Sequence, residues 1–132
     1  KPKIAMLSYS NFGSADGEDA LKMRAATAIL KDKHADWVIE GEMQAHLAFD
    51  KELRQQNYPF ATLGNDTANT LIFPNLSSAN IAYNLLKEAA DIEYIGPILL
   101  GLRKPVHVLQ LGASVREIVN MVAITVVESQ SI

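Results

Sequence analysis

Polar residues that follow the first apolar run of the chain could bind an anion. The run at residues 4–7 (IAML) gives way, before an acidic helical pattern, to hydroxyls, an amide and a glycine: Ser8, Ser10, Asn11, Gly13 and Ser14. The first N–H groups of a helix lack internal partners and, with the helix dipole, favour a bound phosphate or carboxylate. The Gly-Lys-Ser/Thr ending of a phosphate-binding loop is missing. The residues alone leave two interpretations open, a structural turn and an anion site.

Two further loops offer polar groups. Glu40, Glu42 and Gln44 follow a second apolar run. Two carboxylates at this spacing suit acid–base or metal chemistry, while exposed acids at a strand end are the commoner case. Another polar group, Asn75, Ser77, Ser78 and Asn80, precedes a later helical pattern. Helix capping accounts for one or two of these four residues, and a loop facing a polar ligand accounts for all of them.

The sequence predicts no metal site and no cysteine chemistry. His34, His46 and His107 lack the spacing of metal ligands, so we interpret them as surface or structural histidines. The chain has no Cys, which excludes disulfides and thiolate catalysis and favours a cytoplasmic protein. Its 4 Met residues are interpreted as core filler or scattered surface residues.

The polar loops must be positioned by alternating strands and helices. Apolar runs predict strands at residues 3–7 and 37–39 and a third within 69–75. Helical periodicity predicts helices at residues 18–33, 44–56 and 77–90, the last capped by Ser77 or Ser78. Their expected apolar faces are Leu21, Ala25, Ala28 and Ile29; then Ala45, Ala48, Phe49 and Leu53; then Ile81, Leu85 and Ala89.

The last third of the chain no longer shows the alternation of apolar runs and helical patterns. Glycines and prolines punctuate residues 95–112, which predicts two short strands separated by turns. Residues 114–129 carry an apolar stripe that favours a helix, although their β-branched content would also suit a strand. The stripe consists of Val115, Ile118, Val119, Val122 and Val126.

The alternation predicts an α/β fold, an α/β/α sandwich with a mostly parallel sheet. Ligands of such sheets bind at the carboxyl ends of the strands, here the loops at residues 8–19, 40–44 and 75–80. The length of 132 residues suits one domain, and the start at Lys1, directly before an apolar run, predicts a piece of a longer chain.

Charge and hydropathy argue against two classes of partner. The net charge of −3, with both signs interspersed and no long basic run, predicts no nucleic-acid partner. No apolar stretch approaches the roughly 20 residues of a membrane span, and the first residues lack a signal-peptide pattern. We therefore expect no membrane partner.

Five stretches together resemble the C-terminal part of the phosphate acetyl/butyryltransferase family: AMLSYSNFGS, EGEMQ, NTLIFPNLSSANIAYNLL, IGPILLGLRKPV and SVREIVNMVAIT. The resemblance covers nearly the entire chain and keeps the family's motif order. It implies a fold similar to the isocitrate and isopropylmalate dehydrogenases, with an acyl-CoA and phosphate cleft between two domains. Residues 1–109 would be the second domain, and residues 110–132 a segment that returns to a missing first domain.

Two departures from active transferases bear on chemistry. These enzymes commonly carry Ser-Arg-Gly after the KPV strand, where this chain has Gln110, Leu111 and Gly112, while Glu117 occupies their acidic position. Leucine offers neither the charge nor the donors of an arginine fork, and losing one donor to a reacting oxyanion typically costs on the order of 10²–10³ in rate. Asn84 and Glu88 replace basic residues in the helix after the Asn/Ser loop.

The stretch KPVHVLQLGASVREIVNMVAI resembles the transferase-like C-terminal domain of bacterial NADP-dependent malic enzymes. This resemblance implies a domain without catalytic residues or a cofactor of its own, which senses acetyl-CoA and holds a homo-oligomer together. Malate oxidation and decarboxylation, NADP and a divalent metal would belong to a missing N-terminal half. The alternatives are a part of an active phosphate acetyltransferase and a purely architectural dimerisation domain.

Loop position supplies the candidate contacts for acyl-CoA or phosphate. They are Ser8, Ser10, Asn11, Ser14, Asn75, Asn80, Gln110, Arg116 and Glu117.

Overall fold

The computed structural model describes residues 1–90 and 92–130, which form two compact units, Lys1–Asn84 and Leu85–Ile132. The division expected after residue 109 lies inside the second unit and stays a prediction. Residues 131 and 132, the end of the segment expected to return to a first domain, lie outside the described residues.

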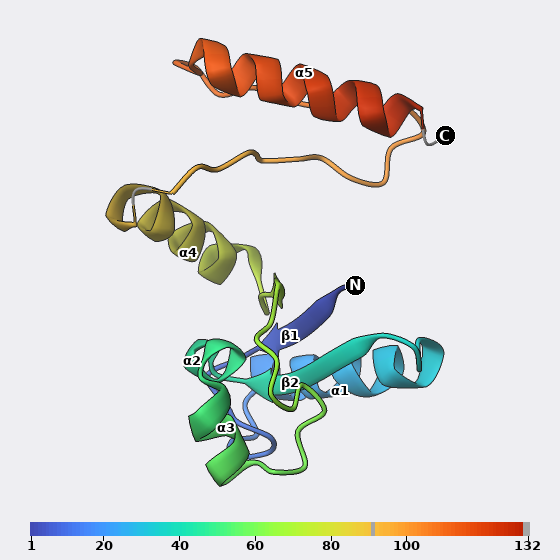
Figure 1. Cartoon of the computed structure of the whole chain (residues 1–132), viewed down its shortest axis with the longest axis vertical. Coiled ribbons are helices and arrows are strands. Elements are labelled where there is room, and N and C mark those ends of the chain that lie inside the picture. The colour runs from blue at the N-terminus through green and yellow to red at the C-terminus, as the bar shows by residue number, and fades with distance from the viewer. Residues whose placement is uncertain (91, 131–132) are drawn as a thin grey trace. The chain divides into compact units, whose positions relative to one another are not determined.

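A parallel sheet organises the first unit (Figure 1). Its strands are β1 (Lys3–Leu7), β2 (Val38–Met43) and β3 (Thr70–Ile72), in the order β2-β1-β3. Helix α1 (Glu18–Lys33) joins β1 to β2, and helices α2 (Ala45–Phe49) and α3 (Lys51–Asn57) lie between β2 and β3. Because the chain leaves β1 toward one neighbour and later returns on its other side, the carboxyl ends of β1 and β3 flank a topological switch point.

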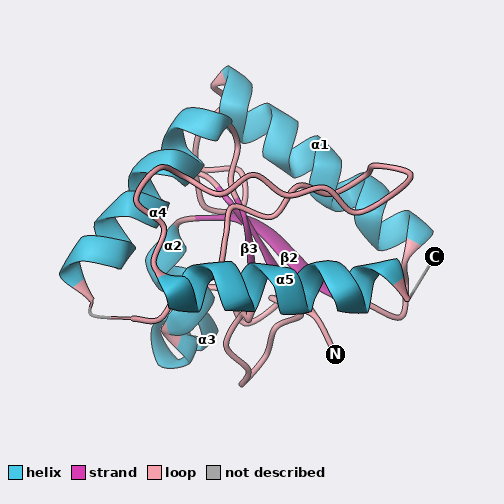
Figure 2. Ribbon diagram, turned by 90° about the horizontal axis from the view of Figure 1, so that it is seen from above, coloured by secondary structure: helices cyan, strands magenta, loops and turns pink. Residues whose placement is uncertain are grey.

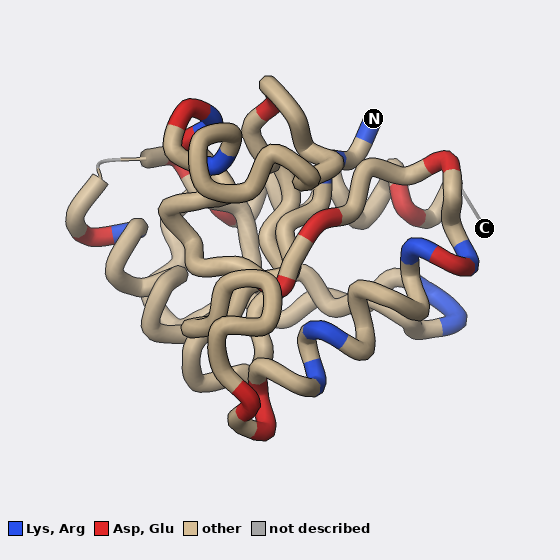
Figure 3. The backbone as a smooth tube through the Cα atoms, turned by 90° about the horizontal axis from the view of Figure 1, so that it is seen from below, with Lys and Arg blue, Asp and Glu red and all other residues tan. Residues whose placement is uncertain are grey.

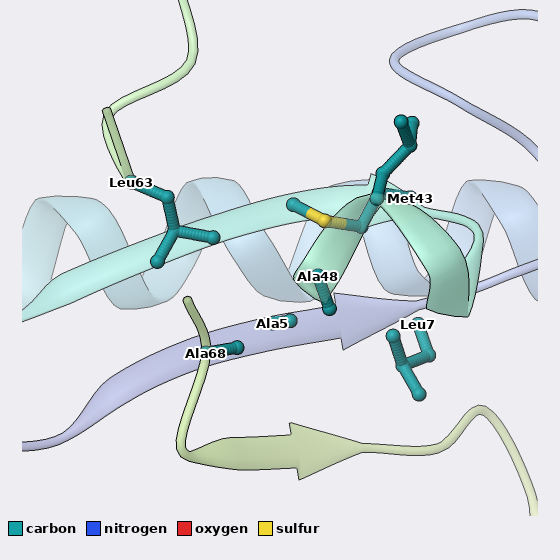
Figure 4. Close-up of a cluster of buried hydrophobic side chains, with 7 residues drawn as sticks. Ala5, Leu7, Met43, Ala48, Leu63 and Ala68 are labelled. Atoms are coloured by element: carbon teal, nitrogen blue, oxygen red, sulfur yellow. The ribbon is translucent and has the colours of Figure 1, made fainter. Parts of the chain in front are cut away.

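Strand β1 supplies side chains to a core on each face of the sheet, because successive residues of a strand point to opposite sides. Ile4 and Met6 pack with Met23 of α1 and Ile39 of β2, and Figure 2 shows α1 beside the strands. The other face buries Ala5 and Leu7 with Met43, Leu47, Ala48, Leu63 and Ala68, most of which are labelled in Figure 4. All four methionines are buried, which confirms the interpretation of core filler.

Helix α1 has the predicted bounds but not the predicted buried face. Leu21, Ala25, Ala28 and Ile29 are exposed, and the buried residues of the helix are instead Ala20, Met23 and Thr27. The threonine is tolerated there because its hydroxyl donates to the Met23 carbonyl oxygen at 2.7 Å, which satisfies the polar group within the helix.

The single helix expected at residues 44–56 is wrong, because Asp50 divides it into α2 and α3. The Asp50 side chain accepts the Leu53 N–H at 2.9 Å and thereby caps α3. The expected face fails too, since Ala45 and Phe49 are exposed. Arg54 is fully buried and donates to the carbonyl oxygens of Leu47, Gly64 and Asp66.

The second predicted strand is longer than expected and carries its acids inside the protein. Strand β2 continues to Met43, so Glu40 and Glu42 are strand residues with 3% and 1% exposure. The interpretation as exposed strand-end acids is therefore wrong. Between them, Gly41 has a φ of +144°, and a Cβ at this position would lie 2.5 Å from the Met6 carbonyl oxygen.

Among the described residues, two helices remain, α4 (Leu76–Ala89) and α5 (Val115–Ser129). The helix expected over 114–129 is confirmed, whereas residues 95–112, all of which are described, contain no strand. The stripe expected on α5 is exposed, and so are Ile81 and Leu85 on α4.

No helix in the described ranges is both long and apolar enough to span a membrane. Lys and Arg are interspersed with Asp and Glu along the chain (Figure 3).

We predict that Gly41→Ala destabilises the first unit by about 2–4 kcal/mol, because the substitution adds both left-handed strain and a clash with β1. The free energy of unfolding in urea measures this. Gly64→Ala is the matched control, since Gly64 also has a positive φ, +53°, but a Cβ added there would have no atom within 4 Å; it should cost about 1 kcal/mol. Equal losses in the two variants would contradict the role of the close approach.

Candidate functional site

The opening loop, residues 8–17, leads from β1 at the switch point and is fastened to the end of β2. Ser8 N donates to the Met43 carbonyl oxygen at 2.9 Å and Phe12 N to that of Glu42 at 2.8 Å. In return, Gln44 N donates to Asn11 Oδ1 at 2.7 Å. The loop therefore takes its position from the strand next to the one that it follows.

The Glu42 carboxylate lies at the centre of this arrangement. Its Oε1 accepts from Ser10 Oγ at 2.8 Å, Gly13 N at 2.8 Å and Arg24 Nη2 at 3.0 Å, and its Oε2 accepts from Arg24 Nε at 3.1 Å. Burial alone would raise the pKa of Glu42, but the donors from Arg24, Gly13 and Ser10 together lower it. Glu42 is therefore a buried, ionised and fully paired acid.

Arg24 joins the loop to helix α1. Besides Glu42, its guanidinium donates to the Ala15 carbonyl oxygen at 2.8 Å and to Asp16 Oδ1 at 3.2 Å. The Arg24 side chain thus binds both the Glu42 carboxylate and the backbone of the loop at Ala15. The sequence indicated neither the role of Arg24 nor the burial of the Glu42 side chain. The apolar residues of α1 predicted that a different face of the helix would be buried.

The candidate residues of the opening loop are brought together and bonded to one another. Asn11 N donates to Ser14 Oγ at 2.8 Å, Ser10 N donates to Ser8 Oγ at 3.2 Å, and the Ser10 and Ser14 hydroxyl oxygens are 3.3 Å apart. Ser10 is fully buried and Ser14 is exposed. These bonds are those of a compact turn, and contact of these residues with a ligand stays a prediction.

Asn75 links the loop after β3 to the start of α1. Its Oδ1 accepts the Ser78 N–H at 2.9 Å, so Asn75 caps α4 and the expected Ser77 or Ser78 cap is wrong. Its Nδ2 donates to Asp19 Oδ2 at 2.9 Å. Asn80 is exposed one turn further along and accepts from Asn84 Nδ2 at 2.9 Å.

Glu117, which the resemblance places at the acidic position of the transferases, has both carboxylate oxygens bonded at the start of α5. Ser114 and Glu117 form a reciprocal capping box, in which Ser114 N donates to Glu117 Oε2 at 2.7 Å and Glu117 N to Ser114 Oγ at 3.2 Å. The Tyr94 hydroxyl donates to Glu117 Oε1 at 2.8 Å. The Ser114 bonds, followed by the Tyr94 bond, lower the pKa of Glu117 to about 2.

A pocket of about 300 Å³ lies beside this cap. It is lined by Ile92, Glu93, Tyr94, Ser114, Arg116, Glu117 and Asn120. Arg116 forms an ion pair with Glu93. The pocket thus brings Arg116 and Glu117 together, whereas Gln110 and Leu111 lie exposed in the preceding turn and outside its lining.

In the described ranges, no group of three His, Cys, Asp or Glu residues is arranged to hold a metal ion. His34 stacks on Trp37 with ring centroids 4.1 Å apart. His107 Nε2 lies 2.9 Å from Glu128 Oε2. These two are structural histidines, as the sequence predicts.

Comparison with known proteins gives one family and two kinds of relative. Residues 1–126 match the family described as Phosphate acetyl/butaryl transferase. The chain is 43% identical to an NADP-dependent malic enzyme of Escherichia coli over 99% of its own length and 17% of the relative. It is also 43% identical to a phosphate acetyltransferase of Clostridium acetobutylicum over 98% of its length and 39% of the relative.

A solved phosphotransacetylase from Streptococcus pyogenes has the same fold. It superposes with a TM-score of 0.91 at 37% identity, covering 99% of this chain and 40% of that chain. The α/β fold expected from the sequence is thereby confirmed. The chain spans well under half of each of these relatives.

We predict that Ser114→Ala raises the pKa of Glu117 only part of the way from about 2 toward its ordinary 4.5, because the hydroxyl bond is lost while the bond from the backbone N–H at position 114, the largest cause of the shift, remains. The lost cap should cost about 1 kcal/mol of stability. Because the folded pKa is lowered, stabilisation by ionised Glu117 is present above about pH 4.5 and is lost as the pH falls toward about 2. The variant should lose part of this acid sensitivity.

A pH titration with ¹³C-labelled glutamate measures the pKa, and unfolding in urea measures the stability. Ser129→Ala is the control, because it removes a hydroxyl that bonds the Val126 carbonyl oxygen at the other end of α5. A Glu117 pKa that stays near 2 in Ser114→Ala would assign the shift to the backbone N–H at position 114 and to Tyr94, and would contradict a contribution from the Ser114 hydroxyl.

Proposed function

Because the chain belongs to the phosphate acetyl/butaryl transferase family, we propose that it is the non-catalytic C-terminal domain of a malic enzyme. In this proposal the domain senses acetyl-CoA and holds a homo-oligomer together. The observation that supports the proposal is the hydrogen bonding of Glu117, which by resemblance occupies the family's acidic position. Its carboxylate forms the capping box of α5 with Ser114.

Glu117 is poorly suited to accept a proton in acyl transfer. Efficient general bases have pKa values near the working pH, whereas the pKa of Glu117 is about 2. Its two oxygens already accept from Ser114 N and from the Tyr94 hydroxyl. A thiol proton arriving at this carboxylate would have to displace a hydrogen bond and would meet a weak base.

Leu111 removes the second requirement of the transfer reaction. At this position the resemblance implies an arginine that would pair with phosphate through two parallel N–H bonds. The leucine side chain is fully exposed, and its neighbour Gln110 is a neutral amide. The nearby Arg116 is already paired with Glu93, so it is an imperfect substitute.

The identities to relatives do not separate the two named classes, since both stand at 43%. The residues at positions 110, 111 and 117 therefore support the malic enzyme assignment over the active acetyltransferase. Malate oxidation and decarboxylation, with NADP and a divalent metal, would then reside in the part of the protein that this chain does not span.

Regulation requires a difference in affinity. Acetyl-CoA can change the malate reaction only if it binds more tightly to one arrangement of the assembly than to another. Of the candidate contacts on the first unit, Ser14, Asn75 and Asn80 are exposed, Ser8 and Asn11 are half-buried, and Ser10 is buried.

Assembly has support in the surface of α5. Val115, Val119 and Val122 are 78%, 59% and 57% exposed, and together with Ile118 and Val126 they form one apolar stripe. Apolar patches of this kind are usually covered by another protein surface. We propose that a second copy or the preceding domain of the same protein covers this stripe.

We predict that acetyl-CoA changes the rate of malate-dependent NADP reduction by the full-length protein, and that a variant truncated before Lys1 keeps malate turnover but loses this response. Acetyl-CoA titration of the initial rate measures it, with NAD in place of NADP as a comparison. If both proteins respond alike, or neither responds, the architectural role takes the place of sensing.

A separate assay addresses the acetyltransferase alternative. The full-length protein with acetyl-CoA and phosphate should form no acetyl phosphate above the uncatalysed rate. Turnover in this assay would overturn the non-catalytic assignment, whatever the outcome of the malate assay.

We predict that Val119→Asp weakens association of the isolated residues 1–132 at least tenfold, because it places a charge in the apolar stripe of α5. Light scattering over a range of concentrations measures the association. Asn120→Asp adds the same charge about 100° further around the helix and should have a smaller effect. A wild-type fragment that is monomeric at high concentration would contradict covering of the stripe by a second copy.

A further inference from the structure

Six consecutive backbone donors of the opening loop, those of residues 10–15, are already used within the protein and are not available to an external anion. From Ser10 to Ala15 every N–H has a partner within the protein. Ser10 N, Asn11 N and Ala15 N donate to serine hydroxyls, Phe12 N and Ser14 N to carbonyl oxygens, and Gly13 N to the Glu42 carboxylate. A loop at a switch point is where an α/β protein usually presents such groups to a ligand.

The groups around Glu42 are those that proteins use to hold an oxyanion. A backbone N–H, a hydroxyl and two N–H groups of a guanidinium converge on one carboxylate at distances of 2.8–3.1 Å. Charge-assisted bonds of this type are the strong ones. The acceptor, however, is a side chain of β2 that is 1% exposed.

The neighbouring acid shows that a buried carboxylate on β2 need not engage the loop. Glu40 is equally buried, but it accepts from Lys31 Nζ at 2.8 Å and from Thr62 Oγ1 at 2.7 Å. None of these donors belongs to the opening loop. The convergence on Glu42 is therefore a property of the loop and Arg24 and does not follow from burial alone.

We infer that the opening loop is an oxyanion-binding loop whose occupant is the carboxylate of Glu42. The protein supplies its own anion at the switch point, so phosphate does not bind there while Glu42 is in place. This inference is independent of the regulatory role proposed above. It implies that Ser10, Gly13 and Arg24 bind the Glu42 carboxylate, so that any phosphate bound by the protein would contact other residues.

Substitution of Glu42 should empty the site and make it available to a small carboxylate. Glu42→Ala keeps Cβ and removes the atoms that acetate contains. We expect Glu42→Ala in the full-length protein to have a lowered Tm, and acetate to raise that Tm by about 2–4 °C in a saturable manner. Acetamide, which has the same shape without the charge, and chloride at equal ionic strength should not.

Glu42→Gln is the matched control, because it removes the charge but fills the space. Its Tm should fall without recovering in acetate, and the wild-type Tm should not respond either. A folded Glu42→Ala variant without an acetate-specific rise in Tm overturns the inference. So does a Glu42→Ala variant that stays unfolded at saturating acetate while Glu42→Gln folds.

A crystal structure of the wild-type protein grown in phosphate tests the inference without a variant. We expect the Glu42 carboxylate to remain on Gly13 N and Arg24. A phosphate bonded to Gly13 N in place of Glu42 would overturn the inference even if both variants failed to fold.

Discussion

The buried charge of Glu42 constrains the arrangement of the opening loop and α1. A carboxylate removed from water must be paired and hydrogen-bonded, or its burial costs several kcal/mol. Glu42 obtains these partners only if the opening loop folds back over the end of β2 and α1 presents Arg24 toward it. The position of the loop, the rotation of α1 about its axis and the exposure of its apolar residues therefore follow from one electrostatic requirement.

The two units share a way of using polar groups. In each unit, an acid that was a candidate for catalysis accepts hydrogen bonds from the segment that precedes a helix. Glu42 does so for the loop before α1, and Glu117 does so at the start of α5. Both have lowered pKa values, and both serve as acceptors for backbone N–H groups. Both carboxylates thereby stabilise the loops that lead into these helices.

Sequence reasoning predicted the strands and helices of the first unit well where one physical rule dominates. The bounds of β1 and α1 agree, because a short apolar run and a long helical pattern leave few alternatives. The buried face of α1 was wrong, since Arg24 ties the helix to the Glu42 carboxylate on β2. Thr27 can lie on the buried face because its hydroxyl bonds a carbonyl oxygen within the helix. Arg54 also had no local signal, because its three acceptors are carbonyl oxygens far along the chain or in another helix.

Arg54 also determines how this part of the protein opens. Its guanidinium, on α3, holds the carbonyl oxygen of Leu47 on α2 and those of Gly64 and Asp66 in the loop before β3. None of these segments can separate without exposing unpaired groups on the others. The amides from α2 to that loop should accordingly exchange with solvent deuterium as one cooperative unit, whose lifetime is set by a single side chain.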